Sequence, residues 1–223
     1  MDRSVANLID PAKSLDGFMP AMGEPIPWKQ AWLIQRRTPD AGAEDATLEL
    51  LYNAARCATR DVLEIGSYKG RSTVYLAAGV KLLNNPSIRV IAIDPFVDPE
   101  GVGGLPSTIS TRPEFEQNLK LCCVDDVVDI IQASSEFVTA QIRDYSVDVL
   151  FIDGDHTYEG VKRDFELYFS KVAVGGVIIF HDATKGYSSF PDVVKLMDEL
   201  VQDVRLNYLC TSGGAVAWYK VSV

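Results

Sequence analysis

The chain has 223 residues, a length that suits one α/β domain with a small N-terminal addition. Its formal net charge of −10 argues against a nucleic-acid partner, which needs a basic face, and against an anionic membrane surface. No apolar run approaches the length of a membrane span, and the first residues lack the continuous apolar core of a signal peptide. We therefore expect a cytoplasmic protein.

The chain contains four cysteines, Cys57, Cys122, Cys123 and Cys210. No two of them have the CxxC spacing of a zinc site, and an adjacent pair does not indicate a disulfide framework. We expect free thiols that act as small core residues, in a reducing compartment.

Residues 1–43 are predicted to be irregular, because recurrent prolines would interrupt a long helix. The segment also carries Trp28, Trp32 and other apolar residues, so it is too apolar for a disordered tail. The open interpretations are a strap over the core or a homo-oligomer contact on the one hand, and a wall of the substrate pocket on the other. Glu44–Cys57 is predicted to form an amphipathic helix. We therefore divide the chain into an N-terminal strap and helix, residues 1–58, and a main domain, residues 59–223.

Short apolar runs alternate with helical patterns from residue 61 onward, which predicts a mostly parallel sheet covered by helices on both faces. A closing strand–turn–strand around Ser212 to Gly214 predicts that the last strand runs antiparallel at the edge. The expected strands are Asp61–Ile65, Ile88–Ile93, Val127–Ile131, Val147–Ile152, Val177–Phe180, Val204–Leu209 and Ala215–Val221. The expected helices are Arg71–Leu83, Thr111–Cys122, Glu136–Arg143, Tyr158–Val172 and Pro191–Val201.

One connection, Pro95 to Pro113, is long and rich in glycine and proline. Loops of that length are uncommon in compact domains unless they are functional or disordered. Because it leaves a strand at the edge where ligands bind, we expect it to act as a mobile lid.

The chain's only two histidines both follow predicted strands. Asp153, Asp155 and His156 come after the strand that ends at residue 152, and His181 and Asp182 come after the strand that ends at residue 180. In open α/β sheets, ligands bind at the carboxyl ends of the strands. We therefore predict that Asp153, His156, His181 and Asp182 share one site, with Asp155 in a supporting position.

A glycine turn follows the first predicted strand, with the pattern E-x-G-x-x-x-G from Glu64 through Gly66 to Gly70. A glycine there lets the backbone turn sharply, and the helix after it favours an anionic group such as a carboxylate. The Glu64 carboxylate would repel a phosphate and suit an ammonium group. A ligand with both an ammonium and a carboxylate therefore fits better than NAD, whose sites usually show G-x-G-x-x-G.

The next two strand ends supply further polar groups. Asp94 could accept hydrogen bonds from a ribose diol, which we favour because of the glycine turn one unit earlier, and the alternative is a helix or loop cap. Ser134 or Ser135 could bond an adenine edge or, equally, act as a helix N-cap.

Five segments in this order resemble class I S-adenosylmethionine-dependent methyltransferases: EIGSYKG, IAIDPF, QASSEF, FIDGDHTYEGVKRDF and GGVIIFHD. The resemblance extends from about residue 60 to the last residue and implies that residues 59–223 are the methyltransferase domain. It is strongest to the group of macrolide-sugar O-methyltransferases (macrocin and mycinamicin types) and a cephalosporin-biosynthesis relative, and more distant to catechol O-methyltransferase. It implies a Rossmann-like, doubly wound, seven-stranded sheet with the last strand antiparallel.

The resemblance also implies S-adenosylmethionine and a divalent cation, with Mg²⁺ the expected ion. His181 stands where relatives carry an acidic residue, and imidazole suits Mn²⁺ or another transition metal better than Mg²⁺. The implied metal ligands are Asp153, His181 and Asp182. The implied cofactor-binding residues are Glu64, Gly66, Ser67, Tyr68, Gly70, Ser72, Asp94, Ser134, Ser135 and Asp153.

We expect an O-methyltransferase in which His156 is the general base and Asp153 assists through the metal. The expected partner is a small hydroxylated substrate, first a sugar, polyol or natural product, and second a catechol-like phenol. A metal-independent enzyme and a non-catalytic cofactor-binding partner in a biosynthetic complex remain open. The missing G-x-G-x-x-G motif argues against an NAD-linked oxidoreductase.

Overall fold

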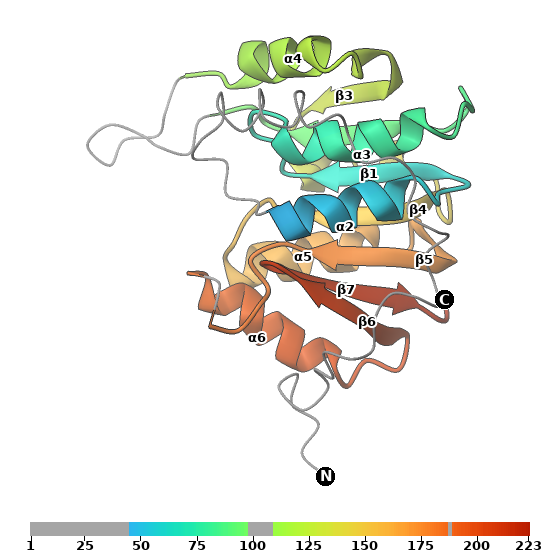
Figure 1. The fold of residues 1–223 in the computed structure, drawn as a ribbon. Coiled ribbons are helices and arrows are strands. Elements are labelled where there is room, and N and C mark those ends of the chain that lie inside the picture. The colour runs from blue at the N-terminus through green and yellow to red at the C-terminus, as the bar shows by residue number, and fades with distance from the viewer. Residues whose placement is uncertain (1–44, 98–108, 187–188) are drawn as a thin grey trace.

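The computed structural model describes residues 45–97, 109–186 and 189–223. The predicted strap at residues 1–43 and most of the predicted lid lie outside these ranges. The described residues form a seven-stranded sheet with helices on both faces (Figure 1), as predicted. The strands are β1 Asp61–Ile65, β2 Val90–Asp94, β3 Val128–Gln132, β4 Val147–Ile152, β5 Val172–Phe180, β6 Leu206–Ser212 and β7 Ala215–Lys220. The helices are α2 Asp45–Ala55, α3 Arg71–Lys81, α4 Arg112–Leu121, α5 Tyr158–Phe169 and α6 Pro191–Leu200, with 3-10 turns η4 Asp125–Val127, η5 Ser135–Phe137 and η6 Thr139–Gln141.

The strand order is β3-β2-β1-β4-β5-β7-β6. Neighbours from β3 to β5 pair in parallel, and β7 is antiparallel to both β5 and β6. The last strand is therefore antiparallel, as predicted, but its predicted place at the edge is wrong, because β6 occupies the edge. The tight turn that contains Gly213, with φ 59°, folds β7 back between β5 and β6.

Two helix predictions need correction. Glu136–Arg143 is not an α-helix but two 3-10 turns, separated by Val138 with φ −120° and ψ 1°. A β-branched residue is a poor helix former, and this conformation ends the turn. The predicted helix Tyr158–Val172 ends at Phe169, and Val172 already belongs to β5. Strand β5 starts earlier than predicted because Gly175, with φ 92°, lets it continue through an irregularity.

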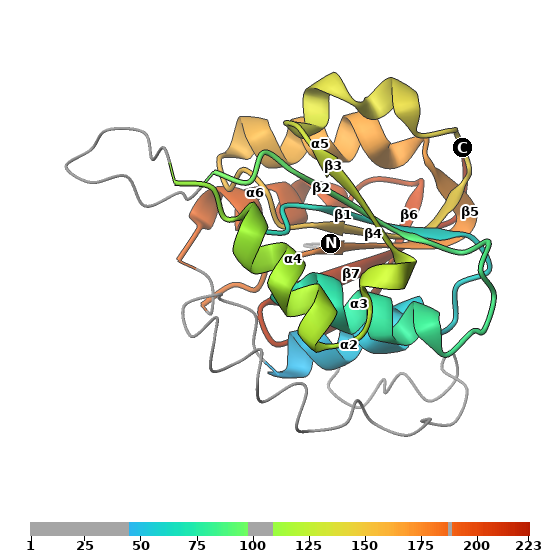
Figure 2. The ribbon, with the colours of Figure 1, turned by 90° about the horizontal axis from the view of Figure 1, so that it is seen from above.

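The sheet, which Figure 2 shows between two layers of helices, separates two apolar clusters. Helices α2, α3 and α4 pack on one face around Leu51, Val74 and Phe115. Helices α5 and α6 pack on the other face around Phe165 and Leu196. Because both faces are covered, the central strands β1, β2 and β4 are mostly buried, and a ligand can approach them at their ends. None of the helices in the described ranges is long and apolar enough to cross a bilayer.

Candidate active site

A cavity of about 720 Å³ lies at the carboxyl ends of the strands. Backbone hydrogen bonds hold the loops that form it in line: Asp153 N donates to Ile65 O at 2.8 Å, and His181 N donates to Ile152 O at 3.0 Å. Its volume is in the range of cofactor and substrate pockets. Of the residues predicted for the site, Gly66, Ser67, Tyr68, Ser72, Asp94, Ser134, Ser135, Asp153, His156, His181 and Asp182 line the cavity, whereas Glu64 and Gly70 do not.

The turn after β1 requires its two glycines. Gly66 has φ +85°, and a Cβ atom there would lie 2.1 Å from the carbonyl oxygen of Asp153. Gly70 has φ +86°, and its Cβ would lie 2.8 Å from Cδ2 of Phe115. No side chain fits at either position, because the backbone of this turn lies close to the loop after β4 and to α4.

Glu64 lies fully buried beneath this turn rather than at the cavity surface. The hydroxyl groups of Ser67, at 2.7 Å, and Thr73 donate to its Oε2. Its Oε1 has no hydrogen-bond partner among the described residues. Burial raises the pKa of Glu64 to about 7, although the hydroxyl hydrogen bonds work in the opposite direction. The Glu64 carboxylate lies behind the residues that line the cavity. Its predicted contact with an ammonium group therefore stays a prediction.

Asp94 makes the contacts of a loop cap. Its Oδ2 accepts hydrogen bonds from Ser67 N at 2.6 Å and Tyr68 N at 2.8 Å, and its Oδ1 accepts one from Phe96 N. These bonds join the turn after β1 to the loop after β2. A carboxylate has about four acceptor positions, so Asp94 retains capacity for a ligand hydroxyl, and its ribose role stays a prediction.

Ser134 and Ser135 line the cavity beside η5 without making a side-chain cap to it. Instead the Ser135 hydroxyl donates to Oδ1 of Asp164, a buried carboxylate of α5, at 2.5 Å. Asp164 also lines the cavity, and the sequence did not single it out. A helical spacing alone does not mark it, because an acidic residue in an amphipathic helix usually faces solvent.

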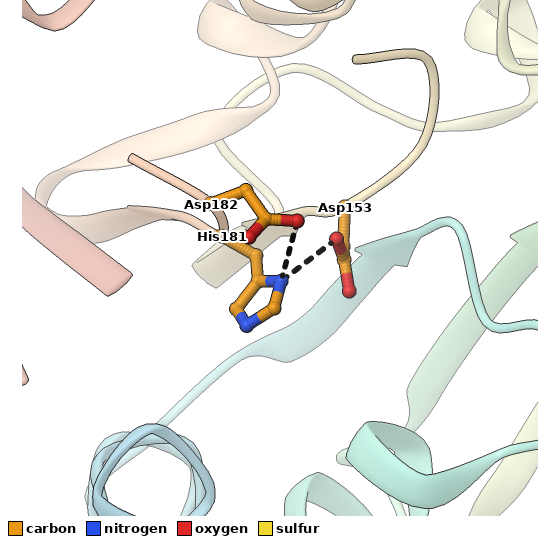
Figure 3. A group of neighbouring side chains, drawn as sticks. All are labelled: Asp153, His181 and Asp182. Atoms are coloured by element: carbon orange, nitrogen blue, oxygen red, sulfur yellow. Dashed lines mark hydrogen bonds and ion pairs between the residues drawn. The ribbon is translucent and has the colours of Figure 1, made fainter. Parts of the chain in front are cut away.

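The four predicted residues at the ends of β4 and β5 do come together. Nδ1 of His181 lies 3.1 Å from Oδ1 of Asp153 and 3.4 Å from Oδ2 of Asp182. Figure 3 shows the ring pointing toward both carboxylates. Nε2 of His156 lies 3.3 Å and 3.2 Å from the same two oxygens. Both imidazoles therefore face both carboxylates.

The charges in this cluster reinforce one another. Burial opposes the charged form of each imidazole, but the two nearby carboxylates outweigh it and raise the pKa of His156 and of His181. Burial likewise works to raise the pKa of Asp153 and of Asp182, but the two imidazoles lower both. The cluster is therefore a set of mutually stabilised ion pairs.

Phe190 is a further residue of the site that the sequence did not mark. It precedes α6, lines the cavity, and stacks on His156 with ring centroids 4.1 Å apart and an interplanar angle of 24°. No motif accompanies an aromatic residue before a helix-initiating proline, so only the three-dimensional structure reveals the contact.

A family described as a methyltransferase domain matches residues 63–183, which include the glycine turn and the carboxylate–imidazole cluster. The chain belongs to this methyltransferase family.

This methyltransferase is 28% identical to protein R132 of Acanthamoeba polyphaga mimivirus over 162 residues, which make up 70% of this chain and 67% of that protein. Its fold is similar to that of a cofactor-bound structure of Rv0187 from MTB, with a TM-score of 0.67, 18% identity and coverage of 94% and 95% of the two chains. It is also similar to the O-methyltransferase TomG from Streptomyces achromogenes in complex with S-adenosylmethionine, with a TM-score of 0.64, 16% identity and coverage of 91% and 92%. These structural likenesses show the methyltransferase fold. The macrolide-sugar group is not identified by any of them.

Proposed function

We propose that the protein is an S-adenosylmethionine-dependent O-methyltransferase that acts on a hydroxyl of a small molecule. The observation that carries this proposal is one cavity that joins the glycine turn after β1 to the cluster of Asp153, His156, His181 and Asp182. The turn is suited to a methyl donor, and the cluster is suited to hold and deprotonate a hydroxyl group. TomG, whose fold is similar, is an O-methyltransferase, which supports this assignment.

The chain's own residues define where the methyl donor would bind. The turn from Gly66 to Ser72 would hold the amino-acid part of the donor. Gly66 would let the donor approach the backbone, and the amino-terminal end of α3 would lie next to the donor's carboxylate. Asp94 would accept hydrogen bonds from ribose hydroxyls with its remaining acceptor capacity. Ser134 lines the end of the cavity where the adenine ring would lie. The bound donor supplies an electrophilic methyl group on a sulfonium.

A divalent cation fits the donor atoms of the cluster. One ligand atom each from Asp153, His181 and Asp182 can be chosen so that all three lie within 4.8 Å of one another. Two carboxylates and one imidazole suit Mn²⁺, Fe²⁺ or Zn²⁺ better than Mg²⁺, which prefers oxygen ligands alone. A cation bound there would polarise the substrate hydroxyl and lower its pKa.

We assign the role of general base to His156. Its Nε2 faces the carboxylates of Asp153 and Asp182. During transfer, an oxygen–carbon bond to the substrate forms as the sulfur–carbon bond breaks, the sulfur keeps the electron pair, and His156 takes the hydroxyl proton. It can do so only in its neutral form, so the negative charge of the two carboxylates must be offset while substrate is bound.

The acceptor surface next to His156 includes the half-exposed ring of Phe190. An aromatic wall beside a polar cluster suits a molecule with an apolar ring face and adjacent hydroxyl groups, such as a sugar, a polyol ring or a phenol. We favour a sugar, polyol or natural product as the acceptor class.

The test is transfer of labelled methyl groups from S-adenosylmethionine to a panel of sugars, polyols and catechols, with Mn²⁺, Mg²⁺ or a chelator. Transfer to an oxygen of at least one acceptor, stimulated by a divalent cation and abolished in His156→Ala, is the expected result. Transfer that a chelator leaves intact would remove the metal from the proposal. Cofactor binding without transfer to any acceptor would favour a non-catalytic partner instead.

A further inference from the structure

Asp164 is a buried carboxylate at the wall of the cavity, outside the cluster described above. Asp164 is 1% exposed, and it lines the part of the cavity beside the loop that follows β3. Two hydrogen bonds fix this loop to α5: the Ser135 hydroxyl donates to Asp164 Oδ1 at 2.5 Å, and the Tyr168 hydroxyl donates to Ser135 O at 2.7 Å. The carboxylate is therefore held in one position against the cavity.

The other carboxylates at this end of the cavity are already engaged. Arg163 lies with Nε 3.4 Å from Glu136 Oε2 and with Nη2 3.9 Å from Asp155 Oδ2, and Asp155 Oδ1 accepts from Thr157 N at 2.9 Å. Within the described part of the chain, the hydrogen bond from Ser135 is the one that the Asp164 side chain makes. Because an ionised carboxylate has about four acceptor positions, Oδ2 of Asp164 can still accept a hydrogen bond from a ligand.

Gly154 leaves that oxygen approachable. A Cβ atom at Gly154 would lie 3.4 Å from Oδ2 of Asp164 and 3.3 Å from Cγ2 of Ile65. Any larger side chain at this position would fill the space beside Oδ2, whereas glycine leaves it to the cavity. The site thus offers a fixed, buried acceptor to a ligand group that carries an N–H donor.

We propose that Asp164 accepts a hydrogen bond from the exocyclic amine of the cofactor's adenine ring and so selects adenine at this end of the cavity. The inference rests on the proposed function, which places the adenine beside Ser134. A buried acceptor discriminates strongly, because a ligand that lacks the donor leaves it unsatisfied. Burial also raises the pKa of Asp164, because it disfavours the ionised carboxylate. A donor N–H stabilises the ionised form and would offset this effect of burial.

The test compares two ligands whose purine rings differ at position 6 and at the neighbouring N1. S-adenosylhomocysteine carries the amine and no proton on N1. S-inosylhomocysteine carries a carbonyl oxygen at position 6, which would face the carboxylate as a second acceptor, and a proton on N1. In calorimetric titrations, the wild-type protein should bind the adenosyl ligand at least about tenfold more tightly. Asp164→Asn should lower that affinity about tenfold and reverse the preference, because its amide N–H can donate to the carbonyl.

Glu136→Gln is the matched control, since it alters a cavity carboxylate that is already paired with Arg163. It should keep the wild-type preference. If Asp164→Asn does not fold, Ser135→Ala takes its place, and a several-fold weaker preference for the adenosyl ligand is the expected result. Equal wild-type affinity for both ligands, or an unchanged preference in a folded Asp164→Asn, would overturn the inference alone. Absence of any binding to the wild type would overturn the proposed function with it.

Discussion

The ring of Phe190 stacks on the imidazole of His156, with ring centroids 4.1 Å apart. Phe190 is the residue before α6, whereas His156 lies in the loop after β4, so the contact connects two loops of the cavity rim. The stack covers one face of the imidazole while its Nε2 faces Asp153 and Asp182. The orientation of the proposed base therefore depends on the start of α6.

Phe190→Ala should lower kcat/KM for the acceptor by about tenfold, because His156 loses a stacking partner and the acceptor loses an apolar wall. Affinity for S-adenosylhomocysteine should stay within about twofold, since the stack lies next to the cluster and not the glycine turn. Phe190→Trp, which keeps an aromatic face, should restore most of the loss. Equal kcat/KM values for the wild type and Phe190→Ala, in steady-state assays, would contradict this role.

His156→Ala should reduce turnover by at least about a hundredfold while cofactor affinity changes little. The reason is that the imidazole takes the hydroxyl proton and does not bind the methyl donor. The comparison requires kcat from methyl-transfer assays and a dissociation constant from calorimetry on the same preparation. Turnover that survives the substitution would remove His156 from the mechanism.

Gly66→Ala should lower the free energy of unfolding by about 3 kcal/mol or more, because the new Cβ would overlap the Asp153 carbonyl and the backbone has positive φ. Gly186→Ala is the matched control: Gly186 has φ +81°, but its Cβ would meet nothing within 4 Å. It should cost only about 1 kcal/mol from the backbone strain. Urea unfolding of both variants checks this, and equal losses would show that close approach to β4 is unimportant.

The ligand-free protein should lose stability as the pH rises from about 4.5 to about 7, because the buried Glu64 holds its proton in this window while the unfolded chain has released it. The folded pKa is raised above the unfolded one, so the loss is complete above the folded value and amounts to about 3 kcal/mol. Glu64→Gln should remove this component. Urea unfolding at pH 5 and pH 8 measures it, and an identical pH dependence in both proteins would refute the assignment.

The sequence predicted the sheet and the shared site because strand ends are marked by abrupt changes of polarity. Asp153, His156, His181 and Asp182 each follow an apolar run, and the carboxyl ends of parallel strands must meet at one edge. The same rule does not determine strand order, which is why β7 was placed at the edge. Only pairing on both sides of β7 decides that point.

Other parts of the site depend on contacts between distant segments. Phe190 contacts His156, which lies 34 residues earlier in the chain, and Asp164 contacts Ser135, which lies 29 residues earlier. No local sequence pattern predicts either contact. Glu64 was predicted to face the ligand because it precedes the glycine turn, but side chains alternate along a strand and its own lies inward, beneath that turn. The division of the chain at residue 58 and the roles of residues 1–43 remain predictions.

The most direct measurement is calorimetric titration of the purified protein with S-adenosylmethionine, with Mn²⁺, with Mg²⁺ and with a chelator. We expect micromolar binding under all three conditions, since the glycine turn and not the cluster holds the donor. We also expect additional metal-dependent heat when a substrate diol is present, with Mn²⁺ more effective than Mg²⁺. The absence of S-adenosylmethionine binding under every condition would overturn the proposed function.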